Sequence, residues 1–214
     1  MIALIMCGGT GSRFITQKKI EKPLACIRGK TLIERVLHAV ISSGQFNKIV
    51  CVSSHNSPYT TELLKKKYKN VNKIEVIVKE GLGYSRDLSN TMSSMVEQKV
   101  FTFPADLALL DTTTVKKLVR QCTPAIRNTC IAAIAERSFL SSVGLTCNSM
   151  FAIGKKEYCY TGVCGFYVGM PFNDNSYTER FSIMNEMQVA VNINTAKDLG
   201  FAEHLLDSIS QDCL

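Results

Sequence analysis

The chain has 214 residues, with 25 Lys or Arg against 18 Asp or Glu, and its formal net charge is +7. A hydrophobic content of 46% excludes a disordered chain, and no apolar run reaches the roughly 18 residues that a membrane-spanning helix needs. The basic excess favours an anionic partner. Small phosphate compounds are favoured over nucleic acid, because the chain has no Trp and no basic block with interleaved aromatic residues.

The nine cysteines predict reduced, mostly buried thiols. Their number is odd, no C-x-x-C pair occurs, and the apolar N-terminal stretch lacks the length and basic start of a secretory signal. We therefore expect a cytoplasmic protein in which the cysteines pack as small apolar side chains.

Short apolar runs alternate with amphipathic segments along the first two thirds of the chain. Strands are predicted at 2–6, 49–52, 74–78, 100–103 and 129–135, and helices at 31–43, 58–68, 88–96 and 112–121. Ser57 is expected to cap the second helix, with Pro58 as its first residue. This order predicts an α/β fold, a Rossmann-like three-layer sandwich around a mainly parallel sheet.

The pattern becomes less regular after Glu136. The stretch 137–187 is predicted to be an insertion of short strands or hairpins on the acceptor side. A strand is expected at 189–194, followed by a last helix whose start carries a capping box, Thr195-x-x-Asp198. Because no internal repeat or low-complexity linker interrupts the chain, we expect a single domain over 1–214.

A glycine-rich turn, Gly8-Gly9-Thr10-Gly11-Ser12-Arg13, follows the first strand directly. Such a turn lets backbone N–H groups approach a phosphate closely. The dinucleotide fingerprint fits only in part, because Phe14 follows where a third glycine is required. The second strand also lacks the acidic residue that would bind a ribose, which argues against a dinucleotide-dependent oxidoreductase.

The turn is followed by Glu21-Lys22-Pro23-Leu24, and the combination resembles nucleotidyltransferases that use a GG-x-G-[ST]-R loop and E-K-P-L. With the stretches at 81–88, 104–107, 162–165 and 192–199, nearly the whole chain resembles the archaeal-type GTP:adenosylcobinamide-phosphate guanylyltransferase family of cobalamin biosynthesis. The resemblance implies that GTP and a phosphorylated corrinoid are the substrates. The alternatives are a molybdenum-cofactor guanylyltransferase, a nucleotide-sugar pyrophosphorylase or a silent nucleotide-binding regulator. A homodimer is left open.

The residues and the resemblance together indicate how the site would work. Lys22 and Arg13 would neutralise the triphosphate, and Asp106, at the carboxyl end of a predicted strand, would hold Mg²⁺. The resemblance adds Asn192 or Asn194 as a metal ligand. The residues expected to bind nucleotide are Gly8, Gly9, Thr10, Gly11, Ser12, Arg13, Lys22, Ser54, Asn56, Gly81, Asp87 and Gly165.

No histidine is expected to act as a general base. A phosphate monoester has a second pKa of about 6, so the acceptor is already largely dianionic at neutral pH. His38, His55 and His204 also lack the partner groups that nucleophilic catalysis requires.

Overall fold

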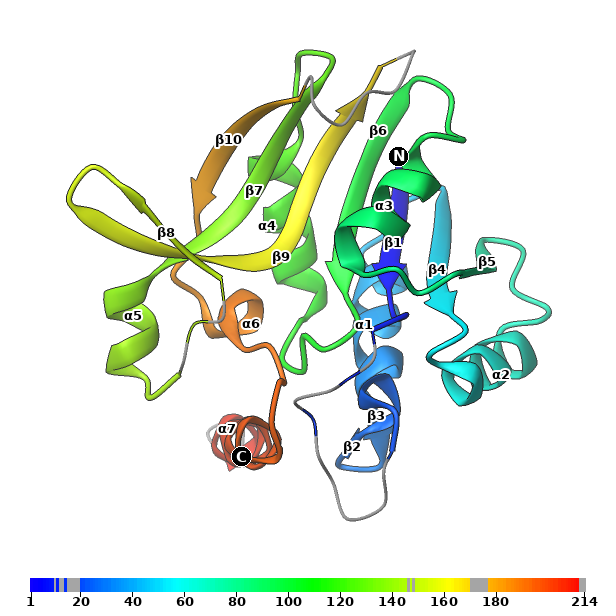
Figure 1. Cartoon of the computed structure of the whole chain (residues 1–214). Helices are drawn as coiled ribbons and strands as arrows, with labels where there is room; N and C mark the ends of the chain where they lie inside the picture. The colour runs from blue at the N-terminus through cyan, green and yellow to red at the C-terminus, as the bar shows by residue number, and fades with distance from the viewer. Residues whose placement is uncertain are drawn as a thin grey trace.

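The computed structural model describes residues 1–9, 11, 14, 20–145, 147, 149–169 and 177–211. In this part of the chain, helices pack on both faces of an eight-stranded sheet with the order β10-β7-β9-β6-β1-β4-β5, and β8 pairs with β9 (Figure 1). The elements are β1 (Ile2–Met6), η1 (Lys22–Leu24), β2 (Cys26–Ile27), β3 (Lys30–Thr31), α1 (Leu32–Ser42), β4 (Lys48–Ser54), α2 (Pro58–Lys67), β5 (Ile74–Lys79), α3 (Tyr84–Met92), β6 (Gln98–Pro104), α4 (Thr112–Cys122), β7 (Thr129–Glu136), α5 (Arg137–Ser142), β8 (Met150–Ile153), β9 (Lys156–Val168), β10 (Thr178–Ile183), α6 (Met187–Ala190) and α7 (Ala196–Gln211).

The centre of the sheet is parallel, as predicted. β1 pairs in parallel with β4 and β6, and β4 pairs in parallel with β5. The carboxyl ends of these strands therefore meet at one edge of the sheet, where open α/β folds bind their ligands. The mixed α/β class and the mainly parallel sheet are confirmed.

Alternate side chains of the central strands form two cores. On one face Ile5, Phe101 and Phe103 are buried against helices α1, α2 and α4. On the other face Leu4 and Val100 pack against α3. Because strand side chains alternate between faces, each apolar strand contributes to both cores.

The stretch 137–187 is more regular than expected, since it contains the 13-residue strand β9. β9 lies between β6 and β7 and is antiparallel to both. Its buried and exposed residues alternate only in part, and its partners are distant in sequence, so local periodicity did not reveal it.

The strand predicted at 189–194 is wrong. Val189 belongs to the short helix α6, and Asn192 makes only an isolated antiparallel bridge with Leu107. Both sides of β6 are already occupied, by β1 and by β9. The apolar Val191 and Ile193 are buried in a small core that includes residues of α1 and α7. Their apolar character therefore reflects burial in this core and not pairing in a sheet.

The capping box predicted at the start of the last helix is confirmed. The backbone N–H of Thr195 donates to Asp198 Oδ2 at 2.8 Å, and the Asp198 N–H donates to Thr195 Oγ1 at 3.2 Å. No helix within the described ranges is long and apolar enough to cross a bilayer.

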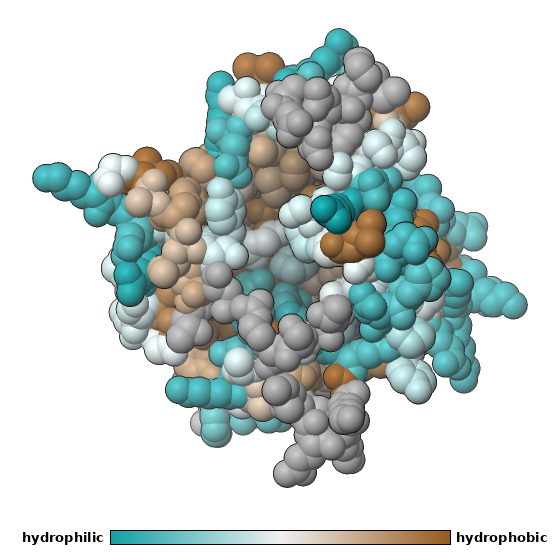
Figure 2. Space-filling view, in the orientation of Figure 1, coloured by the Kyte–Doolittle hydropathy of each residue, from teal (hydrophilic) through white to brown (hydrophobic). Residues whose placement is uncertain are grey.

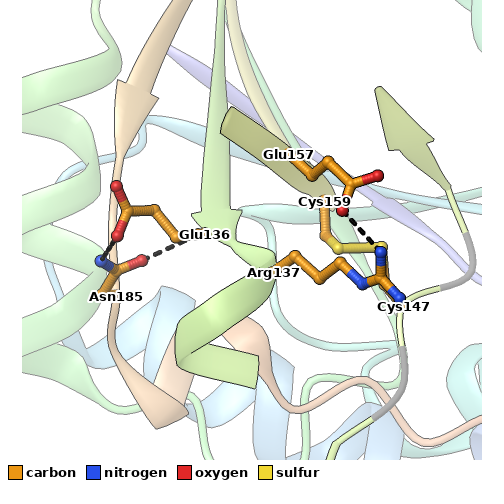
Figure 3. Close-up of a disulfide and its surroundings, with 6 residues drawn as sticks. All are labelled: Glu136, Arg137, Cys147, Glu157, Cys159 and Asn185. Atoms are coloured by element: carbon orange, nitrogen blue, oxygen red, sulfur yellow. Dashed lines mark hydrogen bonds and ion pairs between the residues drawn. A yellow bond between two sulfur atoms is a disulfide. The ribbon is translucent and has the colours of Figure 1, made fainter. Parts of the chain in front are cut away.

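The prediction that the cysteines are reduced is wrong for one pair. Cys147, in the segment after α5, forms a disulfide with Cys159 of β9 (Figure 3). The bridge spans 12 positions and closes a loop that contains β8. Because β9 was not predicted, nothing in the sequence placed these two residues side by side. Six other cysteines of the described chain are free thiols: Cys7, Cys26, Cys51, Cys122, Cys130 and Cys164.

Candidate active site

A cleft of about 920 Å³ opens on the face of the sheet that carries α3. Its lining begins at the carboxyl ends of β1 and β6 and continues over β9 and β7 to β10. Figure 2 shows the hollow in this face of the molecule. α3 packs over the β1, β4 and β6 side of this face, so the strands beyond β6 contribute side chains directly to the cleft.

The glycine turn reaches the cleft with two differently placed glycines. A Cβ on Gly8 would lie 2.9 Å from the Ser54 Cβ, and the Ser54 hydroxyl donates to the Gly8 carbonyl at 2.5 Å. A Cβ on Gly9 would meet no atom within 4 Å, and Gly9 lines the cleft. Gly8 therefore allows the turn to pack against β4, while Gly9 leaves bare backbone facing the cleft.

Lys22 and Asp106 meet in the cleft although 84 positions separate them in sequence. The Lys22 Nζ donates to Asp106 Oδ2 at 2.5 Å, and the two side chains are 22% and 10% exposed. Lys22 begins η1, and Asp106 follows the end of β6, where the Ala105 N–H donates to the Met6 carbonyl. The sheet and the turn together fix this ion pair beside the end of β1.

Asn192 and Asn194 complete the polar end of the cleft. The Asn192 Nδ2 donates to Asp106 Oδ1 at 3.4 Å and to the Thr161 carbonyl at 3.1 Å. The Asn194 Nδ2 donates to the Asn192 carbonyl at 3.3 Å, and its backbone N–H donates to Asp198 Oδ2 at 2.9 Å. The structure thus links Asp106 to Asn192 and Asn192 to Asn194, and their binding of a metal stays a prediction.

This donor set fits a hard divalent cation. In the structure the Lys22 ammonium occupies Asp106 Oδ2 and the Asn192 amide donates to Oδ1, so a cation could bind this carboxylate only after Lys22 moves away. Within the described residues, no group of three or more His, Cys, Asp and Glu is arranged to hold a metal. A cation here would need oxygens from water and phosphate, which is how Mg²⁺ is usually bound.

Four of the residues expected to bind nucleotide lie near one another but outside the cleft lining: Ser54, Asn56, Gly81 and Asp87. The Asn56 Nδ2 donates to the Gly81 carbonyl at 3.2 Å, and Asp87 Oδ1 accepts from the Leu82 N–H at 3.3 Å. The Ser54 hydroxyl is bonded to the glycine turn. In this structure the polar atoms of these residues form hydrogen bonds that stabilise the turns after β1 and β5.

Gly165 does not line the cleft, although Cys164 and Phe166 on either side of it do. A Cβ on Gly165 would lie 1.9 Å from the carbonyl oxygen of Cys122, so this glycine allows α4 to pack closely against β9. Thr10, Ser12 and Arg13 lie outside the described residues.

Sequence reasoning missed Tyr84, the first residue of α3, which lines the cleft. Its hydroxyl donates to the Gly162 carbonyl of β9 at 3.1 Å. Desolvation of the hydroxyl raises the pKa of Tyr84 to about 12; the hydrogen bond with Thr102 lowers it in part, and Cys164 and Asp106 add smaller increases. The group therefore stays a neutral donor at neutral pH. Gly83 has a φ angle of +111°, and the sharp turn at this residue places Tyr84. Gly83 was the one feature of the sequence that could have pointed to Tyr84.

Beyond Tyr84 the cleft becomes less polar. Its floor there is formed by side chains of β7 and β9, among them Cys130, Ala132, Cys164 and Phe166. Tyr160 and Glu179 also line this part, and their side chains are hydrogen-bonded to each other. The cleft therefore has one end that carries the Lys22–Asp106 ion pair and a second end where apolar and polar side chains are mixed.

Comparisons with known proteins show which family the chain belongs to. A family model described as MobA-like NTP transferase domain matches residues 3–157, a stretch that includes Lys22 and Asp106. An adenosylcobinamide-phosphate guanylyltransferase from Methanocaldococcus jannaschii is 37% identical over 97 residues, which are 45% of this chain and 47% of that protein. The match therefore spans about half the length of this curated relative.

Solved structures show the same fold at low identity. HddC from Yersinia pseudotuberculosis, complexed with GMP-PN, superposes with a TM-score of 0.63 and 15% identity over 96% of this chain and 99% of that one. A nucleotidyl transferase from Methanothermobacter gives a TM-score of 0.63 and 16% identity over 97% and 98% of the two chains. Since the family match covers most of the sequence, the chain belongs to the MobA-like NTP transferase domain family and is a nucleotidyltransferase.

Proposed function

We propose that the protein transfers GMP from GTP to adenosylcobinamide phosphate, forming adenosylcobinamide-GDP and pyrophosphate, in cobalamin biosynthesis in the cytoplasm. The observation that carries a nucleotidyl transfer is the meeting of Lys22, Asp106 and Asn192 beside the bare backbone of Gly9. The identity with the Methanocaldococcus protein supports the choice of GTP and of the corrinoid acceptor.

Binding of GTP would rearrange the ion pair. The Lys22 ammonium would turn from Asp106 toward the α-phosphate, while the backbone at Gly9 and Gly11, with Arg13, would hold the β- and γ-phosphates. The Asp106 carboxylate would then be free to bind Mg²⁺ with Asn192 or Asn194. A bound Mg²⁺ neutralises charge on the phosphate oxygens.

The bond-making step needs no proton acceptor on the protein. The acceptor phosphate attacks the α-phosphorus as a dianion, the bond to the β-phosphate oxygen breaks, and pyrophosphate leaves with its electron pair. His38, His55 and His204 are exposed and do not line the cleft. We assign recognition of guanine to Asn56, Gly81 and Asp87, which lie outside the cleft lining. The Asn56 amide and the Asp87 carboxylate would have to exchange their present hydrogen bonds for contacts with the base.

The test is binding of the four NTPs, followed by pyrophosphate release with different acceptors. We expect GTP to bind most tightly and pyrophosphate to be released only with adenosylcobinamide phosphate. Equal binding of ATP and GTP would remove the guanine assignment. Turnover with molybdopterin or a sugar phosphate, and none with the corrinoid, would assign the protein to another branch of the family.

A further inference from the structure

The N-terminus of α2 takes its cap from a distant part of the chain. Ser57, the residue expected to cap this helix, uses its hydroxyl on the Ser54 carbonyl instead, and that prediction is wrong. The backbone N–H groups of Tyr59 and Thr60 donate to Glu21 Oε1 at 2.9 Å and Oε2 at 2.7 Å. The Thr60 hydroxyl also donates to Oε2 at 2.5 Å.

These contacts hold the Glu21 carboxylate in one place and one orientation. Both of its oxygens accept hydrogen bonds, and two of the three donors are first-turn amides of a helix. A carboxylate at a helix N-terminus is stabilised by these amides and by the helix dipole. Hydrogen bonds to an ionised acceptor are about twice as strong as neutral ones.

Glu21 directly precedes Lys22, so the same contacts restrain the turn that carries the lysine. On the other side of Lys22, Pro23 is buried, and the Leu24 N–H donates to the Glu21 carbonyl at 2.8 Å. η1 is thereby tied to α2 through the Glu21 side chain and to the protein core through Pro23. The Lys22 Nζ reaches Asp106 from a backbone that is held at both ends.

We propose that Glu21 is a positioning residue, which uses the N-terminus of α2 as a fixed support for placing Lys22 in the cleft. This inference rests on the role of Lys22 in the proposed function. A lysine has a long flexible stem and presents a point charge, so the position of its backbone decides where the ammonium can act. Displacement of a charge-stabilising group by about 1 Å can lower a rate by about 100-fold.

A double-mutant cycle tests the proposal. Glu21→Gln keeps the shape of the side chain and removes its charge, and we expect it to lower kcat about 10- to 100-fold. Lys22→Ala should lower kcat at least as much. Because Glu21 acts through Lys22, adding Glu21→Gln to Lys22→Ala should cause no further loss, which a merely structural role would not produce.

Asp111 offers a matched control. Its carboxylate caps α4 by accepting from the Thr114 N–H at 2.7 Å, and it does not line the cleft. Asp111→Ala removes this cap. It should lower the melting temperature, because loss of an N-cap costs about 1 kcal/mol, and it should leave kcat unchanged. An equal loss of kcat in both variants, or additive losses in the double mutant, would overturn the positioning role.

A second readout needs no turnover. Lys22 should be acylated slowly by acetic anhydride in the wild type and several-fold faster in Glu21→Gln, with exposed Lys155 as the internal reference in peptide mass spectrometry. An unchanged Lys22 rate would refute the positioning. If the wild type does not turn over GTP with the corrinoid, the proposed function is wrong. The acylation rates would still show whether Glu21 positions Lys22.

Discussion

Two neighbouring glycines of the first turn differ in the space around them. Gly8 has no room for a side chain because β4 lies against it, whereas Gly9 faces open space in the cleft. A substitution at Gly8 therefore tests packing, and a substitution at Gly9 tests binding.

Gly9→Asp should fold normally and bind GTP at least about 10-fold more weakly, since a carboxylate would stand where phosphate is expected. Gly9→Asn is the control of similar shape without the charge and should retain most of the affinity. Calorimetric titration with GTP and thermal melts check both variants. A folded Gly9→Asp protein with wild-type affinity would contradict phosphate binding at this turn.

Asp106→Asn should leave the fold intact and lower turnover by about 100-fold or more, because the amide cannot supply the negative charge that a cation requires. The melting temperature should fall, because the amide leaves the part-buried Lys22 ammonium without its ion pair, but the protein should still unfold cooperatively. Steady-state kinetics at several Mg²⁺ concentrations measure the effect. Near wild-type turnover would disprove the metal assignment.

The pH dependence of turnover should follow the acceptor and not a histidine. Turnover should fall only on the acid side, with an apparent pKa of about 6, as the acceptor phosphate becomes protonated. Gln variants of His38, His55 and His204 should each stay within about a few fold of wild type. A histidine variant as damaged as Lys22→Ala would establish a general base.

Among the helices, α1 carries a complete capping box at its start. The Thr31 N–H donates to Glu34 Oε2 at 2.9 Å, and the Glu34 N–H donates to Thr31 Oγ1 at 3.3 Å. Burial alone would raise the pKa of Glu34, but the Lys67 ammonium and the Thr31 donors outweigh it and lower the pKa to about 2. The helix predicted at 31–43 does begin at this point, and the capping box stabilises its first turn.

This shift predicts a pH-dependent contribution to stability. The folded-state pKa lies below the ordinary value of 4.5, so the contribution of Glu34 is present above pH 4.5 and is lost as the pH falls toward 2. Glu34→Gln should therefore lower stability at neutral pH, and its difference from wild type should shrink in acid. Urea unfolding at pH 7, 4 and 3 measures the difference. A constant difference would contradict the prediction.

The sequence predicted best those helices and strands whose apolar residues follow the period of a helix or a strand within one short segment. Examples are β1, α1 and α4. β9 and the bridge at Asn192 depend on partners far along the chain, so local periodicity could not place them. The residues of the candidate site were likewise predictable only where local sequence identified them. Lys22 and Asp106 could be named from motifs and from a strand end, whereas the roles of Glu21 and Tyr84 depend on contacts that only the folded chain makes.

In the molecule as a whole, the Cys147–Cys159 bridge ties the segment after α5 to the sheet beside the cleft. The same region is held by the ion pair of Arg137 with Glu157 and by the hydrogen bonds between Glu136 and Asn185 (Figure 3). Closing a loop of this length restricts the unfolded chain, which stabilises the folded one by about 3 kcal/mol.

Reduction with dithiothreitol should therefore lower the melting temperature of the wild type, by about 2–4 °C for each kcal/mol lost. Cys147→Ser should melt at the lower temperature with or without the reductant. Cys26→Ser, which removes an exposed free thiol, should still respond to it. A wild-type melting temperature that is insensitive to reduction would show that the bridge does not contribute.

The capping of α2 by Glu21 couples local unfolding of the start of α2 to movement of the turn that carries Lys22. Local unfolding of the first turn of a surface helix normally affects only that helix. Here, opening the amides of Tyr59 and Thr60 also releases the support beside Lys22. Amide hydrogen exchange at these two residues thus reports on the placement of the cleft lysine, and any substrate that holds Lys22 in place should slow the exchange.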